Sequence, residues 1–295
     1  KSISGNLPKP MVHVLGKPLL LHLIEQCVKY NILNIHLLIS YRSEVIEKHF
    51  GNGSQYGVSI QYHTEVIPRG TAGALLDIKD QLNEQYFVIY GDTYFDVDLD
   101  QFWAFHQNNN GDATLFLHPN DHPQDSDLVE VDEEKKIKAI HTYPHANQWQ
   151  RNLVNAALYM MKRSSLAGIE LSSERPDIAK HLFPSMVESC KSLFGYISTE
   201  YIKDMGTPER LERVEQDISS GKVQSLSYKN RKKALFLDRD GVINHEVDHL
   251  SSPEQFELLD GVGNAIHQAN RSGILVVVVT NQPVIARGEL SEAGL

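Results

Sequence analysis

The chain has few of the features that mark secreted, membrane or nucleic-acid-binding proteins. Only two of its 295 residues are cysteines, Cys27 and Cys190, so a disulfide framework and a cysteine-rich zinc site are not visible in it. No apolar run approaches the ~20 residues that cross a bilayer, and no signal peptide is recognisable. The net charge of −10 argues against a general nucleic-acid binder. We therefore expect a cytoplasmic protein with no membrane or nucleic-acid partner.

Alternating strand and helix patterns fill the first 90 residues. Short apolar runs predict strands at 35–39, 58–62 and 86–90. Helical spacing of apolar residues predicts the intervening helices at 18–30, 43–50 and 71–82. This alternation is typical of an α/β fold with a parallel sheet covered on both faces. Between residues 113 and 141 the strands are short and separated by polar turns, which favours an antiparallel insertion and a mixed sheet overall.

Turn residues and a basic cluster interrupt the chain near residues 220–232. The turn sequence is Ser-Ser-Gly-Lys from residue 219, and residues 229–233 are Lys-Asn-Arg-Lys-Lys. Such a stretch is more typical of a solvated linker than of a phosphate site. We expect one domain at 1–220, a linker at 221–232 and a second domain at 233–295. The last 63 residues are few for an α/β core, so the second domain is expected to be incomplete.

Four segments of the first domain carry polar groups suited to a nucleotide. Lys9 stands between two prolines, which hold it on a stiff segment; the alternative is an ordinary surface lysine. Gly70 and Gly73 begin a helix, where small residues let a ligand approach backbone N–H groups or simply allow close packing. Asp92 and Asp204 each follow a strand, where carboxylates can hold Mg²⁺ or cap a turn.

Together these segments resemble the sugar-1-phosphate nucleotidyltransferases. The motifs Leu-Pro-Lys-Pro-Met, Gly-Thr-Ala-Gly-Ala, Tyr-Gly-Asp, Val-Asn-Ala-Ala-Leu-Tyr and Lys-Asp-Met-Gly-Thr-Pro-Glu occur in the order typical of that family. The resemblance covers about residues 1–220 and implies a Rossmann-like fold. It implies attack of a sugar-1-phosphate oxygen on the α-phosphorus of an NTP, with release of pyrophosphate.

The resemblance also assigns roles to individual residues. It implies that Lys9 neutralises phosphate and that Asp92 and Asp204 bind the catalytic Mg²⁺. It implies that the nucleotide pocket and the sugar contacts come from Gly70, Gly73, Asn155 and Glu174. The sequence departs from the family twice. Most of a Gly-rich loop expected upstream of Leu7 is not among residues 1–6, and Ala157 stands where the family often has glycine.

A different chemistry is indicated by the run Ala-Leu-Phe-Leu-Asp-Arg-Asp-Gly-Val-Ile-Asn from residue 234. Asp238 and Asp240 follow an apolar strand two residues apart, so both can face one site, and Gly241 allows the chain to turn away. One carboxylate can attack phosphorus while the other moves the proton of the leaving group. Thr280 and Asn281 end a second buried strand.

This second set resembles the haloacid dehalogenase (HAD) superfamily, in the branch of heptose-bisphosphate and histidinol-phosphate phosphatases. The resemblance implies that Asp238 is the nucleophile and Asp240 the acid/base, and that both hold Mg²⁺, Asp240 through its carbonyl. Thr280 and Asn281 would hold the phosphoryl group. The lysine and further aspartates of the superfamily, and the cysteine loop that binds structural Zn²⁺ in this branch, do not occur in residues 233–295. The resemblance therefore implies a HAD-like domain that is cut short.

The pairing of the two resemblances predicts consecutive reactions. A phosphatase of this branch removes the 7-phosphate of a heptose bisphosphate, and a nucleotidyltransferase would activate the heptose 1-phosphate that remains. We expect transfer from GTP to D-glycero-D-manno-heptose 1-phosphate. The alternatives are a mannose- or glucose-1-phosphate nucleotidyltransferase and a regulatory module that binds nucleotide sugars without turnover. The expected partners are an NTP and sugar phosphates, and oligomeric state is not readable from these patterns.

Overall fold

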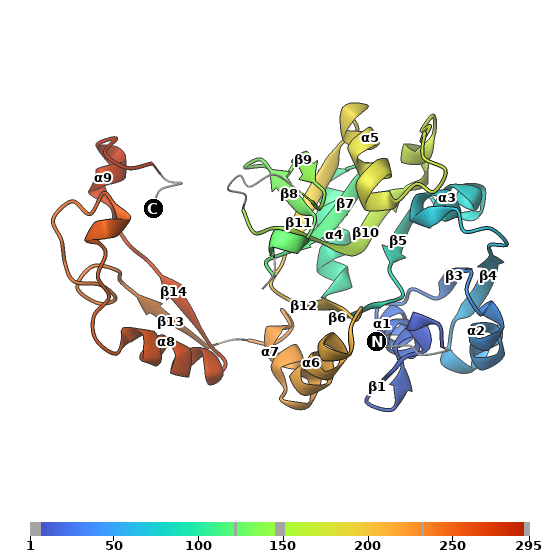
Figure 1. Ribbon diagram of the computed structural model, residues 1–295, viewed down its shortest axis with the longest axis horizontal. Coiled ribbons are helices and arrows are strands. Elements are labelled where there is room, and N and C mark those ends of the chain that lie inside the picture. The colour runs from blue at the N-terminus through green and yellow to red at the C-terminus, as the bar shows by residue number, and fades with distance from the viewer. Residues whose placement is uncertain (1–6, 121–122, 145–150, 232, 292–295) are drawn as a thin grey trace. The chain divides into compact units, whose positions relative to one another are not determined.

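The computed structural model describes residues 7–120, 123–144, 151–231 and 233–291 and divides the chain into two compact units (Figure 1). The first unit ends at Tyr228 and the second begins at Lys229. No helix within the described ranges has both the length and the apolar character that a membrane crossing requires.

The main sheet of the first unit is mixed, as the sequence predicts. Its central strand, β10 (Val154–Lys162), pairs antiparallel with β5 (Gln85–Ile89) on one edge and with β7 (Ala113–His118) on the other. β7 pairs parallel with β11 (Leu193–Ile197), so β5, β7 and β11 run in one direction and β10 runs against them. The antiparallel insertion consists of β8 (Leu128–Val131) and β9 (Ile137–His141).

Smaller sheets complete the first unit. β3 (Asn34–Ile39) pairs parallel with β4 (Ser59–Thr64), as expected for two strands joined by a helix. The antiparallel pair β6 (Thr93–Asp96) and β12 (Tyr201–Asp204) joins segments that are more than 100 residues apart. The third pair is β1 (His13–Val14) with β2 (Lys17–Pro18).

The helices of the first unit begin at recognisable sequence signals. The side chain of Asp98 accepts hydrogen bonds from two N–H groups at the start of α4 (Leu99–Asn109), and that of Thr207 accepts one from the Arg210 N–H at the start of α6 (Pro208–Ser219). Pro208 occupies the first helical position, where proline is favoured. The other helices are α1 (Leu19–Lys29), α2 (Ser43–Phe50), α3 (Gly70–Asp77), α5 (Phe183–Glu188), preceded by a π-helical turn at Ile178–Leu182, and α7 (Lys222–Leu226). Short 3-10 turns lie at Lys9–Met11, Ser54–Tyr56, Lys79–Gln81, Pro123–Asp125 and Arg163–Leu166.

Part of the segment that the sequence suggests as a linker is folded into the first unit. Residues 222–226 form α7, and Val223 on this helix is buried in a cluster with Val214 of α6. Glu200 anchors the C-terminal end of the first unit, because its Oε1 accepts a hydrogen bond from the backbone N–H of Tyr228 at 3.0 Å. The expected start of the linker at 221 is therefore too early, since an apolar contact anchors this turn.

The second unit is built on two parallel strands. β13 (Lys233–Leu237) pairs with β14 (Ile274–Val278), and α8 (Val262–Arg271) precedes β14. A 3-10 turn at Pro253–Gln255 and the short helix α9 (Pro283–Ala286) complete it. Only three apolar side chains of its described residues are buried: Ile243, Leu250 and Val284.

Candidate functional site

Lys9 and Asp92 meet at the end of β5. Pro8 and Pro10 flank Lys9 at the start of the first 3-10 turn, and the Lys9 Nζ lies 3.1 Å from the Asp92 Oδ2. Gly91 allows this approach, because a Cβ at this position would lie 3.1 Å from the Pro10 Cγ. Both charged side chains keep access to solvent, with 54% of Lys9 and 33% of Asp92 exposed. The pair is thus open to an arriving phosphate or cation.

Asp204 reaches the same place through the pairing of β6 and β12. The backbone partner of Asp204 is Thr93, and the next residue, Met205, donates its N–H to the Asp92 carbonyl at 2.8 Å. The Asp204 Oδ2 pairs with the guanidinium of Arg210, which stands in the first turn of α6. The structure therefore brings together Lys9, Asp92 and Asp204, which the sequence predicts as one site.

The donor set at Asp92 and Asp204 fits a divalent cation whose remaining ligands come from substrate. Mg²⁺ is usually held by one or two carboxylates together with phosphate oxygens and water. Among the described residues no group of three or more His, Cys, Asp or Glu side chains gathers as a metal site. Two carboxylates on neighbouring strand ends thus suit a cation that arrives with a phosphate, and Lys9 and Arg210 balance their charge without it.

Gly70 is required by the close contact between α3 and the segment before the π-helical turn. Its φ is +73°, and a Cβ there would lie 2.5 Å from the Pro176 carbonyl oxygen. The same carbonyl accepts a hydrogen bond from the Ala72 N–H at 3.0 Å. Pro176 therefore occupies part of the α3 N-terminus that the sequence suggests for a ligand.

The remaining residues assigned to the first site lie on α3, on the segment before the π-helical turn and on β10. Gly73 is buried, and a Cβ there would lie 2.9 Å from the Arg69 Cβ, so its lack of a side chain serves packing. Glu174 is exposed on the segment that leads to Pro176. The Asn155 Oδ1 accepts a hydrogen bond from the Ala157 N–H at 3.3 Å within β10.

The backbone at Ala157 suits the glycine that the family resemblance leads us to expect at this position. Ala157 has a φ of +55°, and the register of β10 against β7 shifts between Asn155 and Tyr159. A left-handed residue at a bulge favours glycine. The bulge turns the Ala157 carbonyl towards the Tyr90 N–H, 3.3 Å away, and so connects β10 to the strand end that carries Asp92.

Thr71 is a site residue that the sequence interpretation missed. Its hydroxyl donates to the Asp177 Oδ2 at 2.8 Å and accepts from the Ile178 N–H at 2.9 Å. The Tyr90 hydroxyl also donates to it, at 3.3 Å. Burial raises the pKa of Tyr90, so this donor keeps its proton at neutral pH. The network joins three segments, and only the position of Thr71 between two glycines hints at it.

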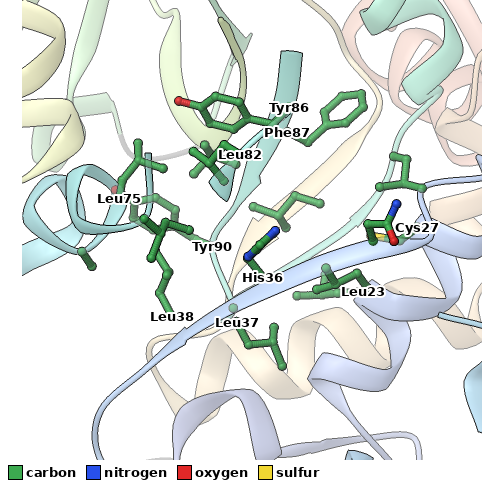
Figure 2. A pocket seen from close by; sticks show the side chains of 18 of the residues that line it. Leu23, Cys27, His36, Leu37, Leu38, Leu75, Leu82, Tyr86, Phe87 and Tyr90 are labelled. Carbon is green, nitrogen blue, oxygen red and sulfur yellow. The ribbon is translucent and has the colours of Figure 1, made fainter. Parts of the chain in front are cut away.

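A cavity of about 1030 Å³ opens beside these residues. One end is lined by Lys9, Pro10, Gly70, Gly91 and Asp92. The rest is lined mainly by apolar side chains of α1, β3, α3 and β5, several of which Figure 2 labels, including Leu23, Leu37, Leu75 and Phe87. The whole cavity has the volume of a small-molecule pocket, and its polar end supplies the charged groups.

In the second unit the strand ends also bring the assigned residues together. β13 and β14 stay in register past their ends, because the Val279 N–H donates to the Leu237 carbonyl at 2.8 Å. Gln282 then bridges the Asp240 Oδ2 and the Thr280 Oγ1, each at 2.6 Å. Asp238 and Asn281 are exposed beside this bridge. Gly241 has a φ of +74°, which lets the chain turn after Asp240.

Asp240 is held as an anion. Burial opposes its ionisation, but hydrogen bonds from Arg239, Gln282 and Asn244 outweigh burial and lower the pKa of the carboxyl below its ordinary value. Arg239 alone contributes two of these contacts, at 3.1 Å each. A general acid must carry a proton, so an acid role for Asp240 requires these contacts to change when substrate binds.

Comparisons with known proteins place most of the chain in one family. Residues 1–221 match the family described as Nucleotidyl transferase. Mannose-1-phosphate guanylyltransferase of Mycobacterium tuberculosis is 32% identical over 224 residues, which are 75% of this chain and 61% of that protein. The catalytic subunit beta of mannose-1-phosphate guanylyltransferase from Drosophila pseudoobscura pseudoobscura is 32% identical over 213 residues, 71% of this chain and 56% of that protein. The chain thus spans about three fifths of the length of the curated relatives it matches.

A solved structure supports the fold. HddC from Yersinia pseudotuberculosis superposes with a TM-score of 0.63 at 21% identity, over 74% of this chain and 92% of that one. The same protein has also been solved in complex with GMP-PN. The family match covers the segments that carry Lys9, Asp92 and Asp204. This match, together with the mixed sheet and the grouping of charged residues at the strand ends, shows that the chain belongs to the nucleotidyl transferase family.

Proposed function

We propose that the first unit transfers a guanylyl group from GTP to a sugar 1-phosphate and releases pyrophosphate. The observation that carries the proposal is that Lys9 pairs with Asp92 at the polar end of the cavity, while the pairing of β12 with β6 holds Asp204 next to the same strand end. A phosphate oxygen attacks the α-phosphorus, and the bond from that phosphorus to the β-phosphate oxygen breaks. Because this displacement needs no covalent enzyme intermediate, positioning and charge neutralisation carry the rate.

Each of the three charged groups has a distinct part in this reaction. Lys9 is held by flanking prolines, so its ammonium can meet a phosphate with little reorientation. The carboxylates of Asp92 and Asp204 would hold Mg²⁺, which supplies charge neutralisation to the triphosphate when bound. Arg210 must give up its contact with Asp204, or share that carboxylate, when the cation is present.

The sugar is proposed to have the manno configuration. The relatives above carry the name mannose-1-phosphate guanylyltransferase. The resemblance of residues 233–295 to heptose-bisphosphate phosphatases further suggests D-glycero-D-manno-heptose 1-phosphate. The two sugars share the ring configuration and differ at the exocyclic carbon. Glucose 1-phosphate, which differs at the 2-hydroxyl, is the weaker candidate.

Pyrophosphate release from the full chain tests the proposal. GTP, ATP, UTP and dTTP would each be combined with the 1-phosphates of mannose, the manno-heptose and glucose. Release that requires GTP and one of the two manno-configured sugars is the expected result. A preference for glucose 1-phosphate would overturn the sugar assignment. Binding of a nucleotide sugar without release for any pair would instead identify a regulatory binding module.

For the second unit we propose the phosphoryl chemistry of a HAD-like phosphatase acting on a sugar bisphosphate. The proposal is supported by Asp238 and Asp240 after β13 and by the Gln282 bridge to Thr280 after β14. The Asp238 carboxylate would attack phosphorus, and the bond to the sugar oxygen would break. Asp240, protonated once substrate binding loosens its hydrogen bonds from Arg239, Asn244 and Gln282, would give its proton to that oxygen. Water then releases phosphate from Asp238. Mg²⁺ at Asp238 would neutralise the phosphoryl oxygens.

Phosphate release from heptose 1,7-bisphosphate, compared between the chain and its Asp238→Asn variant, tests this second proposal. We expect any release by the chain to disappear in the variant. Equal release by both proteins would remove Asp238 from the reaction. The pyrophosphate assay is independent of this outcome, because it uses different substrates.

A further inference from the structure

The turn between β12 and α6 holds Arg210 against Asp204. The Thr207 Oγ1 accepts a hydrogen bond from the Arg210 backbone N–H at 3.3 Å, which fixes the first turn of α6. The Asp204 Oδ2 accepts a charge-assisted hydrogen bond from the Arg210 Nη1. Gly206 leaves room for this contact, because a Cβ there would lie 3.3 Å from the Asp204 Oδ2 and 3.9 Å from the Arg210 Nη1. Backbone and side-chain contacts thus both direct Arg210 onto this carboxylate.

Four charged side chains at these strand ends balance one another. Lys9 pairs with Asp92 at 3.1 Å and Arg210 pairs with Asp204, so two positive and two negative charges sum to zero. A divalent cation alone would leave this group strongly positive. A divalent cation that arrives with a triphosphate brings more negative charge than positive. Since like charges repel and opposite charges attract, the balance favours a cation accompanied by phosphate over a cation that arrives alone.

Arg210 is the group with which a cation must compete at Asp204. The side chain of Asp204 is 45% exposed and that of Arg210 is 30% exposed, so solvent reaches the carboxylate while the ion pair is intact. A cation at this carboxylate would lie beside the guanidinium, and the repulsion between the two would weaken its binding. The guanidinium keeps its proton at any ordinary pH, so only a movement of the Arg210 side chain relieves this repulsion.

We propose that Arg210 is a resident counter-ion that keeps a free divalent cation away from Asp92 and Asp204, so that these carboxylates take up a cation together with the triphosphate. The inference rests on the proposed function, because the cation site is the one proposed for the transfer reaction. It goes further by giving Arg210 control over when that site fills. The negative charge of the phosphates is what makes the release of Arg210 from Asp204 favourable.

Binding of Mn²⁺ alone to the full chain, measured by electron paramagnetic resonance without nucleotide, tests the proposal. Mn²⁺ prefers the same carboxylate and water ligands as Mg²⁺, and its free form gives a signal that is lost on binding. Arg210→Gln keeps a polar side chain on α6 and removes one positive charge beside Asp204. We expect this variant to bind Mn²⁺ about tenfold or more tightly than the parent at low ionic strength. Equal affinities in the two proteins would overturn the proposal.

A second arginine on the same helix provides the matched control. Arg213 also pairs with an aspartate, its Nε lying 3.2 Å from the Asp217 Oδ1. Arg213→Gln removes the same charge from α6 but leaves the contact between Arg210 and Asp204 in place. We expect this variant to bind Mn²⁺ as the parent does. A gain as large as that of Arg210→Gln would show that any loss of positive charge on α6 strengthens binding, and it would contradict the role of Arg210.

Two further variants locate the bound ion and guard against a folding defect. Asp204→Asn, added to Arg210→Gln, should abolish the gain in affinity, because an amide lacks the charge that holds the cation. A gain that survives this substitution would place the ion elsewhere and reject the proposal. Arg210→Ala also removes the charge and introduces the residue most favourable to a helix, so it should bind Mn²⁺ as tightly as Arg210→Gln. The test therefore does not depend on one variant being folded.

Failure of the transfer proposal would be recognised separately, because that proposal is tested by pyrophosphate release with a nucleotide and a sugar phosphate. If no pair gives release, tighter Mn²⁺ binding by Arg210→Gln would still support the counter-ion role. If release is observed but the parent and Arg210→Gln bind Mn²⁺ equally, only the role of Arg210 is rejected.

Discussion

Two strands with similar sequences, β7 in the first unit and β13 in the second, have opposite environments. The apolar residues of β7 are buried on both faces, and Phe116 is 0% exposed. Most of β13 is exposed, and Phe236 is 67% exposed. Both runs are typical of buried parallel strands. An apolar strand sequence therefore indicates that both faces of the strand would be stable when buried. Whether they are buried depends on the helices and strands that pack beside it.

The acidic sites of the two units differ in a related way. In the first, Asp92 and Asp204 each face one basic side chain and stay partly exposed. In the second, Asp240 is surrounded by donors from Arg239, Asn244 and Gln282, while Asp238 is exposed. The first arrangement suits an exchange of cations at the carboxylates. The second fixes one carboxylate and leaves the other available to a substrate.

The largest expected effect is a difference in stability between matched substitutions in β7 and β13. Phe116 packs against Phe102 and Tyr196, with ring centroids 5.8 and 5.7 Å apart. Phe116→Ala should lower the free energy of unfolding of the first unit by about 3–5 kcal/mol, because it leaves a cavity in the core. Phe236→Ala should change the stability of the second unit by only about 0.5 kcal/mol.

Both tryptophans, Trp103 and Trp149, belong to the first unit, so denaturant unfolding followed by tryptophan fluorescence reports that unit alone. Calorimetry then reports both. A large loss from Phe236→Ala would contradict the comparison, since it would mean that β13 is covered in solution.

The sequence predicts the order of elements well wherever the apolar residues of one helix or strand follow the spacing of that element and are buried. Residues 43–50 form α2 as expected, and most of the helix expected at 18–30 is α1. The helix expected at 71–82 is shorter, since α3 ends at Asp77 and a 3-10 turn follows. Boundaries such as this depend on contacts with distant segments, which local periodicity does not contain.

The next effect tests the carboxylates of the first site. Asp92→Asn should lower pyrophosphate release by about 10²–10³-fold, because an amide neutralises neither Lys9 nor a divalent cation. Asp132→Asn is a matched control, since Asp132 pairs with Lys138 at 2.9 Å on the insertion and does not line the cavity. Equal turnover in Asp92→Asn and the control would remove Asp92 from the site.

The site residues also divide into those with a local sequence pattern and those that depend on contacts between distant segments. Lys9, Asp92 and Asp204 can be predicted as site residues because each stands at a recognisable strand end or proline pair. Arg210 and Thr71 were missed, because their roles arise from the fold: one from the α6 start beside Asp204, the other from a hydroxyl shared by three segments. No local pattern reports such meetings.

A smaller effect concerns pH and a buried histidine. His106 is fully buried in α4, and its Nδ1 lies 2.8 Å from the Thr114 Oγ1. Burial, with a contribution from Lys162, lowers its pKa from 6.5 to about 4. Below pH 6.5 the unfolded chain takes up a proton that the folded chain refuses, so stability falls as pH falls towards 4. The loss between pH 7 and pH 5 should be about 2 kcal/mol.

Urea unfolding at both pH values checks this dependence against His106→Gln, which keeps a polar group near Thr114 but does not titrate. The variant should lose about 2 kcal/mol less than the parent over that interval. His267→Leu changes an exposed histidine on α8 of the second unit and should leave the first unit unaltered. An equal pH dependence in parent and His106→Gln would show that other groups are responsible.

The smallest expected effect separates backbone strain from crowding. Gly70 and Gly168 share a φ of +73°, but a Cβ at 168 meets nothing within 4 Å, whereas at 70 it would lie 2.5 Å from the Pro176 oxygen. Gly168→Ala should therefore cost about 1 kcal/mol from strain alone. Gly70→Ala should cost about 1–2 kcal/mol more, since the 175–176 backbone must move.

That movement carries Glu174 with it, so the KM for the sugar phosphate should rise in Gly70→Ala and stay constant in Gly168→Ala. Equal losses of stability in the two variants, measured by denaturant unfolding, would mean that the contact with Pro176 does not constrain α3.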